Sequence, residues 1–240
     1  EDITMCIGMG KMPLERIYQT ECIFIASKQK EPMKPLPNST GWPFLNKQEQ
    51  SPKIILASAS PRRRSLLEQI GVKFEIIPST IEEDISLSLK PDKFVEYYAQ
   101  VKAKNVSQKN RDALVIGADT VVVFNKSILG KPGSFDEAYT MLSTLSGNTH
   151  SVYTGVSLQL INKSISHTFH AQTQVTFNNL TNKEIEFYIE YYKPYDKAGS
   201  YGIQDWFSVC VEKIDGCYFN VMGLPLNKLY TELKSIVQIN

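Results

Sequence analysis

Residues 53–71, KIILASASPRRRSLLEQIG, pass from a strand pattern through a tight turn into a helix pattern. The apolar run at 53–58 predicts a short buried strand. Ser60 is a typical helix N-cap, Pro61 suits the first helical turn, and Gly71 suits the end of a helix. This order of strand, turn and helix indicates an α/β domain.

Strand and helix patterns continue through the rest of the chain without strict alternation. Further strands are predicted at residues 72–76, 114–124, 151–161, 165–177 and near 208–213. The strand at 114–124 is expected to be interrupted at Gly117, and those at 151–161 and 165–177 to form a hairpin. Helices are predicted at about residues 91–106, 134–147, 181–192 and 226–233. The sequence therefore predicts one α/β domain with a mixed sheet over residues 52–240.

Residues 1–51 differ from this domain in composition. Four prolines stand among Lys, Gln, Asn and Ser, and no period of a helix or strand is sustained. This composition predicts a poorly ordered or linker-like extension.

The overall composition argues against several classes of protein. A net charge of +1 indicates neither a nucleic-acid surface nor a membrane surface. No apolar run approaches the roughly 20 residues of a membrane span. The four cysteines form no Cys-x-x-Cys pair and lack metal-ligand spacing, so we expect reduced thiols in a cytoplasmic protein.

The turn between residues 58 and 64 is a candidate phosphate site. Two hydroxyls, Ser58 and Ser60, would lie beside the positive end of the following helix. Arg62, Arg63 and Arg64 are unfavourable in a first helical turn unless an anion is present, and arginine binds phosphate in a two-point geometry. The alternative is a solvated basic turn.

Two groups of carboxylates are candidate metal or base residues. Asp119 lies inside an apolar strand, where a charged group needs a cation or hydrogen-bond donors. Residues 82–84 (EED) provide the oxygen ligands that Mg²⁺ and Mn²⁺ prefer. A hydrogen-bonded structural aspartate and a solvated acidic triplet are the alternatives.

Two lysines and one loop complete the candidate site. Lys102 falls at the edge of the apolar stripe of its helix, where it either snorkels to solvent or reaches into a cleft. Lys131 lies in a turn suited to phosphate or to an ordinary loop. The glycine-spaced segment 196–204 (DKAGSYGIQ) allows a backbone to approach a ligand, and the amide of Gln204 could read a base edge.

Other catalytic classes are poorly supported. His167 and His170 are three residues apart on a predicted strand and should point to opposite faces, so they should not share a metal. The chain has neither the Walker phosphate loop nor the dinucleotide-binding glycine fingerprint.

Eight segments of the chain occur in the order typical of one family. They are LASASPRRRSLL (56–67), IEED (81–84), VKAK (101–104), GADTVVV (117–123), LGKP (129–132), LSGNTHSVYTGV (145–156), DKAGSYGIQ (196–204) and VMGLPL (221–226). This set resembles the Maf family of nucleotide pyrophosphatases over about residues 53–235. The resemblance implies an elongated, mixed-sheet Maf/ITPase-like fold with two lobes around a central cleft, and a possible homodimer.

The resemblance also implies roles for individual residues. Ser58, Arg62 and Arg63 match the phosphate-binding turn. Glu83 matches a metal-site carboxylate, and Asp119 the proton acceptor. The remaining matches are to phosphate-facing lysines (Lys102 and Lys131) and to positions tied to substrate choice (Arg62, Thr120 and Gln204).

The form of segment 196–204 is similar to the family branch that acts on dTTP, UTP and modified pyrimidine nucleotides. Two departures occur. Gly130 replaces a glutamate found in many relatives, and residues 205–207 (DWF) replace a more glycine-rich segment.

The function implied is hydrolysis of nucleoside triphosphates to monophosphate and pyrophosphate, a house-cleaning activity that needs Mg²⁺ or Mn²⁺. Whether Asp119 serves as base, metal ligand or both is left open. One alternative is a catalytically silent nucleotide-binding module of the cell-division inhibitor type. Others are an accessory domain of a larger fused methyltransferase and, third, a nucleic-acid-binding protein.

Overall fold

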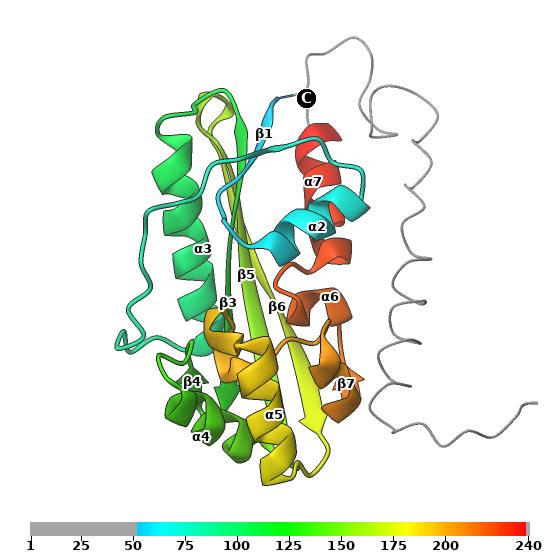
Figure 1. Ribbon diagram of the computed structural model, residues 1–240. Coiled ribbons are helices and arrows are strands. Elements are labelled where there is room, and N and C mark those ends of the chain that lie inside the picture. The colour runs from blue at the N-terminus through cyan, green and yellow to red at the C-terminus, as the bar shows by residue number, and fades with distance from the viewer. Residues whose placement is uncertain (1–51, 239–240) are drawn as a thin grey trace, which may run out of the picture. The chain divides into compact units, whose positions relative to one another are not determined.

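The computed structural model describes residues 52–238, and the extension predicted at residues 1–51 lies outside them (Figure 1). The strands are β1 (Ile54–Leu56), β2 (Glu75–Ile76), β3 (Leu114–Phe124), β4 (Ser127–Leu129), β5 (Thr149–Leu160), β6 (Ile165–Phe177) and β7 (Val211–Asp215). The α-helices are α2 (Pro61–Gln69), α3 (Pro91–Ser107), α4 (Phe135–Leu145), α5 (Asn182–Tyr192), α6 (Tyr218–Val221) and α7 (Leu226–Gln238).

The seven strands form one mixed sheet, as predicted. Their order is β2-β1-β3-β5-β6-β7, and β4 pairs with β3 outside this path. The strands β2, β1 and β3 are parallel, whereas β3, β5, β6 and β7 pair in antiparallel fashion. The predicted hairpin is the β5–β6 pair, which is linked by residues 161–164.

The alternation of side chains along β3 divides the core into two layers. Leu114, Ile116 and Ala118 join the main core, which includes apolar residues of α2, α4, α5 and α7. Val115 and Val121 face the opposite way and pack with residues of α3. Figure 1 accordingly shows α3 along one side of the long strands and α2 and α7 along the other.

Gly117 does not interrupt β3, so the expected break in this strand is wrong. The strand continues from Leu114 to Phe124. A Cβ at Gly117 would collide with the carbonyl of Ala99 and would lie 2.8 Å from the Cβ of Ala103, both in α3. The glycine is therefore needed for close helix-to-sheet packing rather than for a bend.

The predicted helix starts are confirmed by their caps. Ser60 Oγ accepts a hydrogen bond from the Arg63 amide, and Ser134 Oγ accepts one from the Glu137 amide. Thr181 and Glu184 form a reciprocal capping box at α5. These local contacts satisfy helical N–H groups that have no partner within the helix.

The observed strands differ from the predicted ones in three places. The strand expected at residues 72–76 is limited to Glu75–Ile76, and both residues are exposed. The strand expected near 208–213 begins only at Val211, because residues 206–210 form a 3₁₀ helix whose first turn is capped by the Asp205 side chain. β4 was not predicted. It follows a two-residue turn in which Asn125 and Lys126 both have positive φ, and the lysine there lacks the usual glycine signal.

The described residues also bear on the expectations about membrane spans and cysteines. Between residues 52 and 238, no helix has the length and apolar character required to cross a bilayer. Cys210 and Cys217 are free thiols, whereas Cys6 and Cys22 lie outside the described part.

Candidate active site

A gap beside β3 creates a cleft. The parallel strand β1 leaves β3 after Ile116, where the amide of Ala57 donates the last hydrogen bond, at 2.8 Å. The pairing with β4 begins only at Val122. Within the described residues, positions 117–121 therefore have an unpaired edge, at the carboxyl end of β1 where α/β folds commonly bind ligands.

The cleft at this edge has a volume of about 670 Å³. The turn before α2 and the segment from Pro78 to Ile85 line it, and so do Gly130, Lys131 and residues 196–204. This arrangement corresponds to the expected central cleft. The structure brings all the predicted site residues to its wall: Ser58, Arg62, Arg63, Glu83, Lys102, Asp119, Thr120, Lys131 and Gln204.

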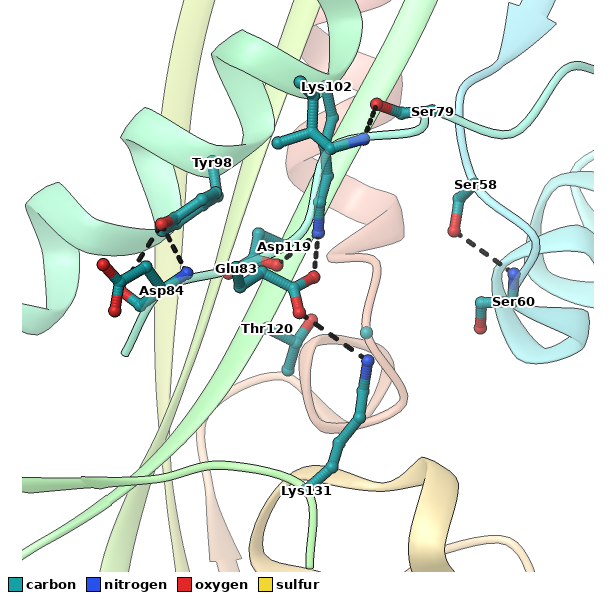
Figure 2. Close-up of polar contacts among 12 residues, drawn as sticks. Ser58, Ser60, Ser79, Glu83, Asp84, Tyr98, Lys102, Asp119, Thr120 and Lys131 are labelled. Carbon is teal, nitrogen blue, oxygen red and sulfur yellow. Dashed lines mark hydrogen bonds and ion pairs between the residues drawn. The ribbon is translucent and has the colours of Figure 1, made fainter. Parts of the chain in front are cut away.

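A lysine lies between two carboxylates at the centre of the cleft (Figure 2). Lys102 of α3 donates to Asp119 Oδ1 at 2.7 Å and also pairs with Glu83. The second oxygen of Glu83 lies 3.7 Å from Lys131 Nζ. Lys102 therefore reaches into the cleft instead of snorkelling, and Asp119 is held by an ion pair rather than by a purely structural cap.

The surroundings shift the two carboxyl groups in opposite directions. Burial raises the pKa of Asp119 above its ordinary value despite the attraction of Lys102. Burial would also raise the pKa of Glu83, but the charge and hydrogen bond of Lys102, together with Lys131, outweigh it and lower that pKa. A carboxylate with a raised pKa beside one with a lowered pKa is typical of a site with distinct acid–base roles.

The three consecutive arginines have different partners. Arg62 donates to Asp196 at 2.9 Å, across the cleft opening. Arg64 points outward and pairs with Glu68 on the exposed surface of α2. Arg62 therefore lines the cleft in an ion pair with Asp196, whereas Arg64 corresponds to the solvated alternative.

Arg63 makes three side-chain hydrogen bonds inside the site. Its Nε donates to the Gly223 carbonyl at 2.8 Å, Nη1 to Ser58 Oγ at 3.1 Å and Nη2 to Thr120 Oγ1 at 3.0 Å. It therefore ties the turn before α2 to β3 and to the segment before α7. A planar guanidinium can make these contacts at fixed angles and still present further N–H groups.

Tyr98 positions the acidic segment and was not predicted as a site residue. Its hydroxyl accepts a hydrogen bond from the Asp84 amide at 2.6 Å, one turn of α3 before Lys102 (Figure 2). Asp84 itself turns away and accepts from the Ser86 amide. Of the acidic triplet, Glu83 is the member that meets the two lysines. The only sequence signal for Tyr98 is its spacing of four residues from Lys102.

The segment from 196 to 204 is held from behind by a buried histidine. The His150 ring lies 2.8 Å from the Tyr201 hydroxyl, and the Gly199 amide donates to the Gly130 carbonyl at 3.0 Å. Burial lowers the pKa of His150 to about 4, so the ring is neutral near pH 7. These contacts place the exposed side chain of Gln204 at the cleft, and His150 was not predicted to have this role.

The other two histidines are separated as expected. His167 lies 2.9 Å from Glu232 of α7, whereas His170 lies 2.7 Å from Glu96 of α3. These helices cover opposite faces of the sheet. The pair cannot form one metal site.

The donor set of the cleft is compatible with a divalent ion shared with a substrate. No cluster of three or more His, Cys, Asp or Glu side chains suited to a metal occurs in residues 52–238. Asp119 Oδ2 is buried and has no hydrogen-bond partner in this part of the chain. Mg²⁺ commonly takes one or two carboxylates and completes its shell with water and substrate phosphates. Glu83 and Asp119 fit that pattern.

Comparisons with known proteins identify the family of this chain. The family described as Maf-like protein matches residues 53–236. A dTTP/UTP pyrophosphatase of Bacillus cereus strain ATCC 14579 is 50% identical over 182 residues, which is 76% of this chain and 94% of that protein. One from Bacillus cereus strain ATCC 10987 is 50% identical over 186 residues, 78% of this chain and 91% of the relative. The chain therefore belongs to the Maf-like protein family.

Proposed function

We propose that this protein hydrolyses nucleoside triphosphates, including dTTP, UTP and modified pyrimidine nucleotides, to a nucleoside monophosphate and pyrophosphate. The observation that carries the proposal is the meeting of Asp119, Glu83 and Lys102 in one cleft beside the arginine turn. The relatives named dTTP/UTP pyrophosphatase support the same substrate class.

The cations of the cleft match the charge of a triphosphate. About four negative charges on the substrate repel a nucleophile until they are neutralised. Arg62 and Lys131 are close enough to the opening to meet the phosphates, and the N-terminal end of α2 adds partial positive charge. These groups would stabilise the charge that develops on the departing pyrophosphate.

Asp119 is the residue suited to activate water. Its raised pKa brings it closer to neutral pH than an ordinary aspartate, as a general base requires. The water oxygen forms a bond to the α-phosphorus, its proton passes to Asp119, and the bond from the α-phosphorus to the bridging oxygen breaks. Glu83 and Asp119 would hold Mg²⁺ or Mn²⁺, which supplies charge neutralisation at the phosphates when bound.

Pyrophosphate release from dTTP and UTP in the presence of Mg²⁺ tests the proposal. Asp119→Asn should lower turnover by about 10² to 10⁴-fold while nucleotide binding persists, because a general base contributes this much. Arg64→Ala is the matched control, since Arg64 lies outside the cleft, and it should retain the wild-type rate. Full turnover in Asp119→Asn would contradict the assignment of the base.

A nucleotide-binding module without turnover is the second candidate. It would bind dTTP and release no pyrophosphate with either Mg²⁺ or Mn²⁺. The Asp119 oxygen that lacks a partner within the described chain argues against it, because binding alone gives no reason to bury an unsatisfied acceptor at the cleft.

A further inference from the structure

A chain of hydrogen bonds runs behind the cleft from an arginine to a backbone carbonyl. Arg63 Nη2 donates to Thr120 Oγ1 at 3.0 Å, and Thr120 Oγ1 lies 3.0 Å from Thr154 Oγ1. Thr154, which is fully buried on β5, donates to the Asn220 carbonyl at 3.0 Å. Thr120 and Thr154 are direct cross-strand neighbours, so the pairing of β3 and β5 fixes their approach.

The number of protons on the hydroxyl groups determines which group donates in each of these hydrogen bonds. Each threonine hydroxyl has one proton, and a carbonyl can only accept. Thr154 gives its proton to Asn220, so the proton between the two hydroxyls must come from Thr120. The guanidinium of Arg63 has no acceptor and can only donate. Thr120 is thus left with a single free lone pair and no proton to offer a ligand.

We infer that Thr154 is a positioning residue that makes Thr120 an obligate hydrogen-bond acceptor toward the cleft. Thr120 lines the cleft, whereas Thr154 does not. The substrate group that meets Thr120 is therefore an N–H or O–H donor. The inference rests on the proposed function for the identity of that substrate.

This polarity provides a means to select among pyrimidine nucleotides. Thymine and uracil carry a proton on N3, whereas cytosine presents a lone pair there. The amide of Gln204 both donates and accepts, so it can present either edge after rotation and is a weak discriminator alone. Thr120, which can only accept, disfavours the lone pair on N3 of cytosine, since two facing acceptors would both lack a donor.

The first test measures binding by the wild-type protein, independently of turnover. Non-hydrolysable α,β-methylene analogues of UTP, 3-methyl-UTP and CTP are titrated by calorimetry with Mg²⁺. We expect the 3-methyl and cytosine compounds to bind about 10- to 100-fold more weakly, the range for one unpaired buried polar group. The donor that meets Thr120 could instead be a hydroxyl of the sugar. In that case the 2′,3′-dideoxy analogue of UTP, rather than the 3-methyl and cytosine compounds, should bind more weakly. Equal affinity for all four would overturn the inference.

The second test breaks the chain of hydrogen bonds from Arg63 through Thr120 and Thr154 to the Asn220 carbonyl, which we call the relay, and preserves the shape of the Thr154 side chain. Thr154→Val deletes the hydroxyl, and the Asn220 carbonyl retains the Gly223 amide as a donor at 3.0 Å. The Thr120 proton then loses its acceptor and can turn toward the cleft. We expect the preference found in wild type to fall about tenfold, whereas Thr154→Ser keeps it.

Thr149→Val is the matched control for the second test. Thr149 lies on the same strand and shares a 2.8 Å hydroxyl contact with Thr176, but it does not line the cleft. Its selectivity should equal that of wild type. An unchanged preference in folded Thr154→Val would refute the relay. Since binding is measured with inert analogues, a failure of catalysis alone would count only against the proposed function.

Discussion

Lys102 Nζ lies 2.7 Å from Asp119 Oδ1, and both side chains are almost completely buried. They come from α3 and β3, and Lys102 also pairs with Glu83. A single ammonium group therefore separates two carboxylates that would otherwise repel each other. In a buried environment such a cation affects both stability and the acid–base properties of its neighbours.

Replacing Lys102 by Met should impair both folding and turnover. One carboxyl group would take up a proton, and we expect the free energy of unfolding to fall by about 3 kcal/mol, as for other broken buried pairs. Pyrophosphate release should fall at least about 100-fold, because loss of the Lys102 charge raises the pKa of Asp119 further and weakens it as an ionised base. Urea unfolding and steady-state rates measure the two effects. Lys104→Met, an exposed change on the same helix, serves as control, and equal losses there would refute the explanation.

Tyr98→Phe should raise the Mg²⁺ concentration that turnover requires, with only a small effect on the fold. The change removes the hydroxyl that holds the Asp84 amide, so Glu83 would be less well placed. Because one hydrogen bond is lost, we expect the Mg²⁺ concentration at half-maximal rate to rise roughly two- to tenfold. Tyr97→Phe alters the exposed neighbouring ring and should leave that concentration unchanged. A rise in both variants would point to a general effect on α3.

Gly117→Ala should displace α3 from the sheet. Its new methyl group would meet the Ala99 carbonyl and the side chain of Ala103, so we expect a loss of roughly 1–3 kcal/mol, as for other overpacked cores. Turnover should fall as well, because Lys102 moves with the helix. Gly133→Ala is the control, since a Cβ there would lie 3.5 Å from the flexible carboxylate of a nearby glutamate, an ordinary contact. Thermal unfolding and turnover are measured for both variants, and equal losses would count against the packing explanation.

The buried His150 should make stability depend on pH. Its pKa is lowered to about 4 by burial, whereas an unfolded histidine titrates near 6.5. Between these values the unfolded chain binds more protons, so the stabilising contribution is full above about pH 6.5 and is lost as the pH falls toward 4. The loss amounts to about 3 kcal/mol, at roughly 1.4 kcal/mol for each pKa unit.

Urea unfolding between pH 4 and 7.5 measures this effect. His150→Phe removes the titrating group, so its unfolding free energy should have a shallower dependence on pH, although the Tyr201 hydroxyl loses its partner. His167→Phe is the comparison, because it makes the same exchange at a ring that is partly exposed to solvent. Identical slopes in wild type and His150→Phe would contradict the prediction.

Much of the fold could be predicted because its signals are local. The caps at Ser60, Ser134 and Thr181 and the alternating strands need only neighbouring residues to be recognised. The break expected at Gly117 was wrong because the reason for that glycine lies in α3, distant in sequence. Similarly, β4 depends on a turn whose second residue, Lys126, gives no glycine signal.

The site could be predicted only where a residue type carries chemistry of its own. Charged residues such as Asp119 and Lys102 stand out in apolar patterns, and the family resemblance supplied the rest. Tyr98, Thr154 and His150 were missed because their side chains are ordinary for a core. Their importance comes from contacts to other segments of the chain, which only folding brings near.

The strand β5 contributes none of the predicted site residues, yet three of its positions support the cleft. Thr154 and His150 point to one face, and Gly155 lets α3 approach the other. Because side chains alternate along a strand, inserting one residue between His150 and Thr154 would place these two side chains on opposite faces of the sheet. Such a chain could retain every charged residue of the cleft and still lose the framework that aligns them, so β5 should tolerate changes of side chain far better than changes of length.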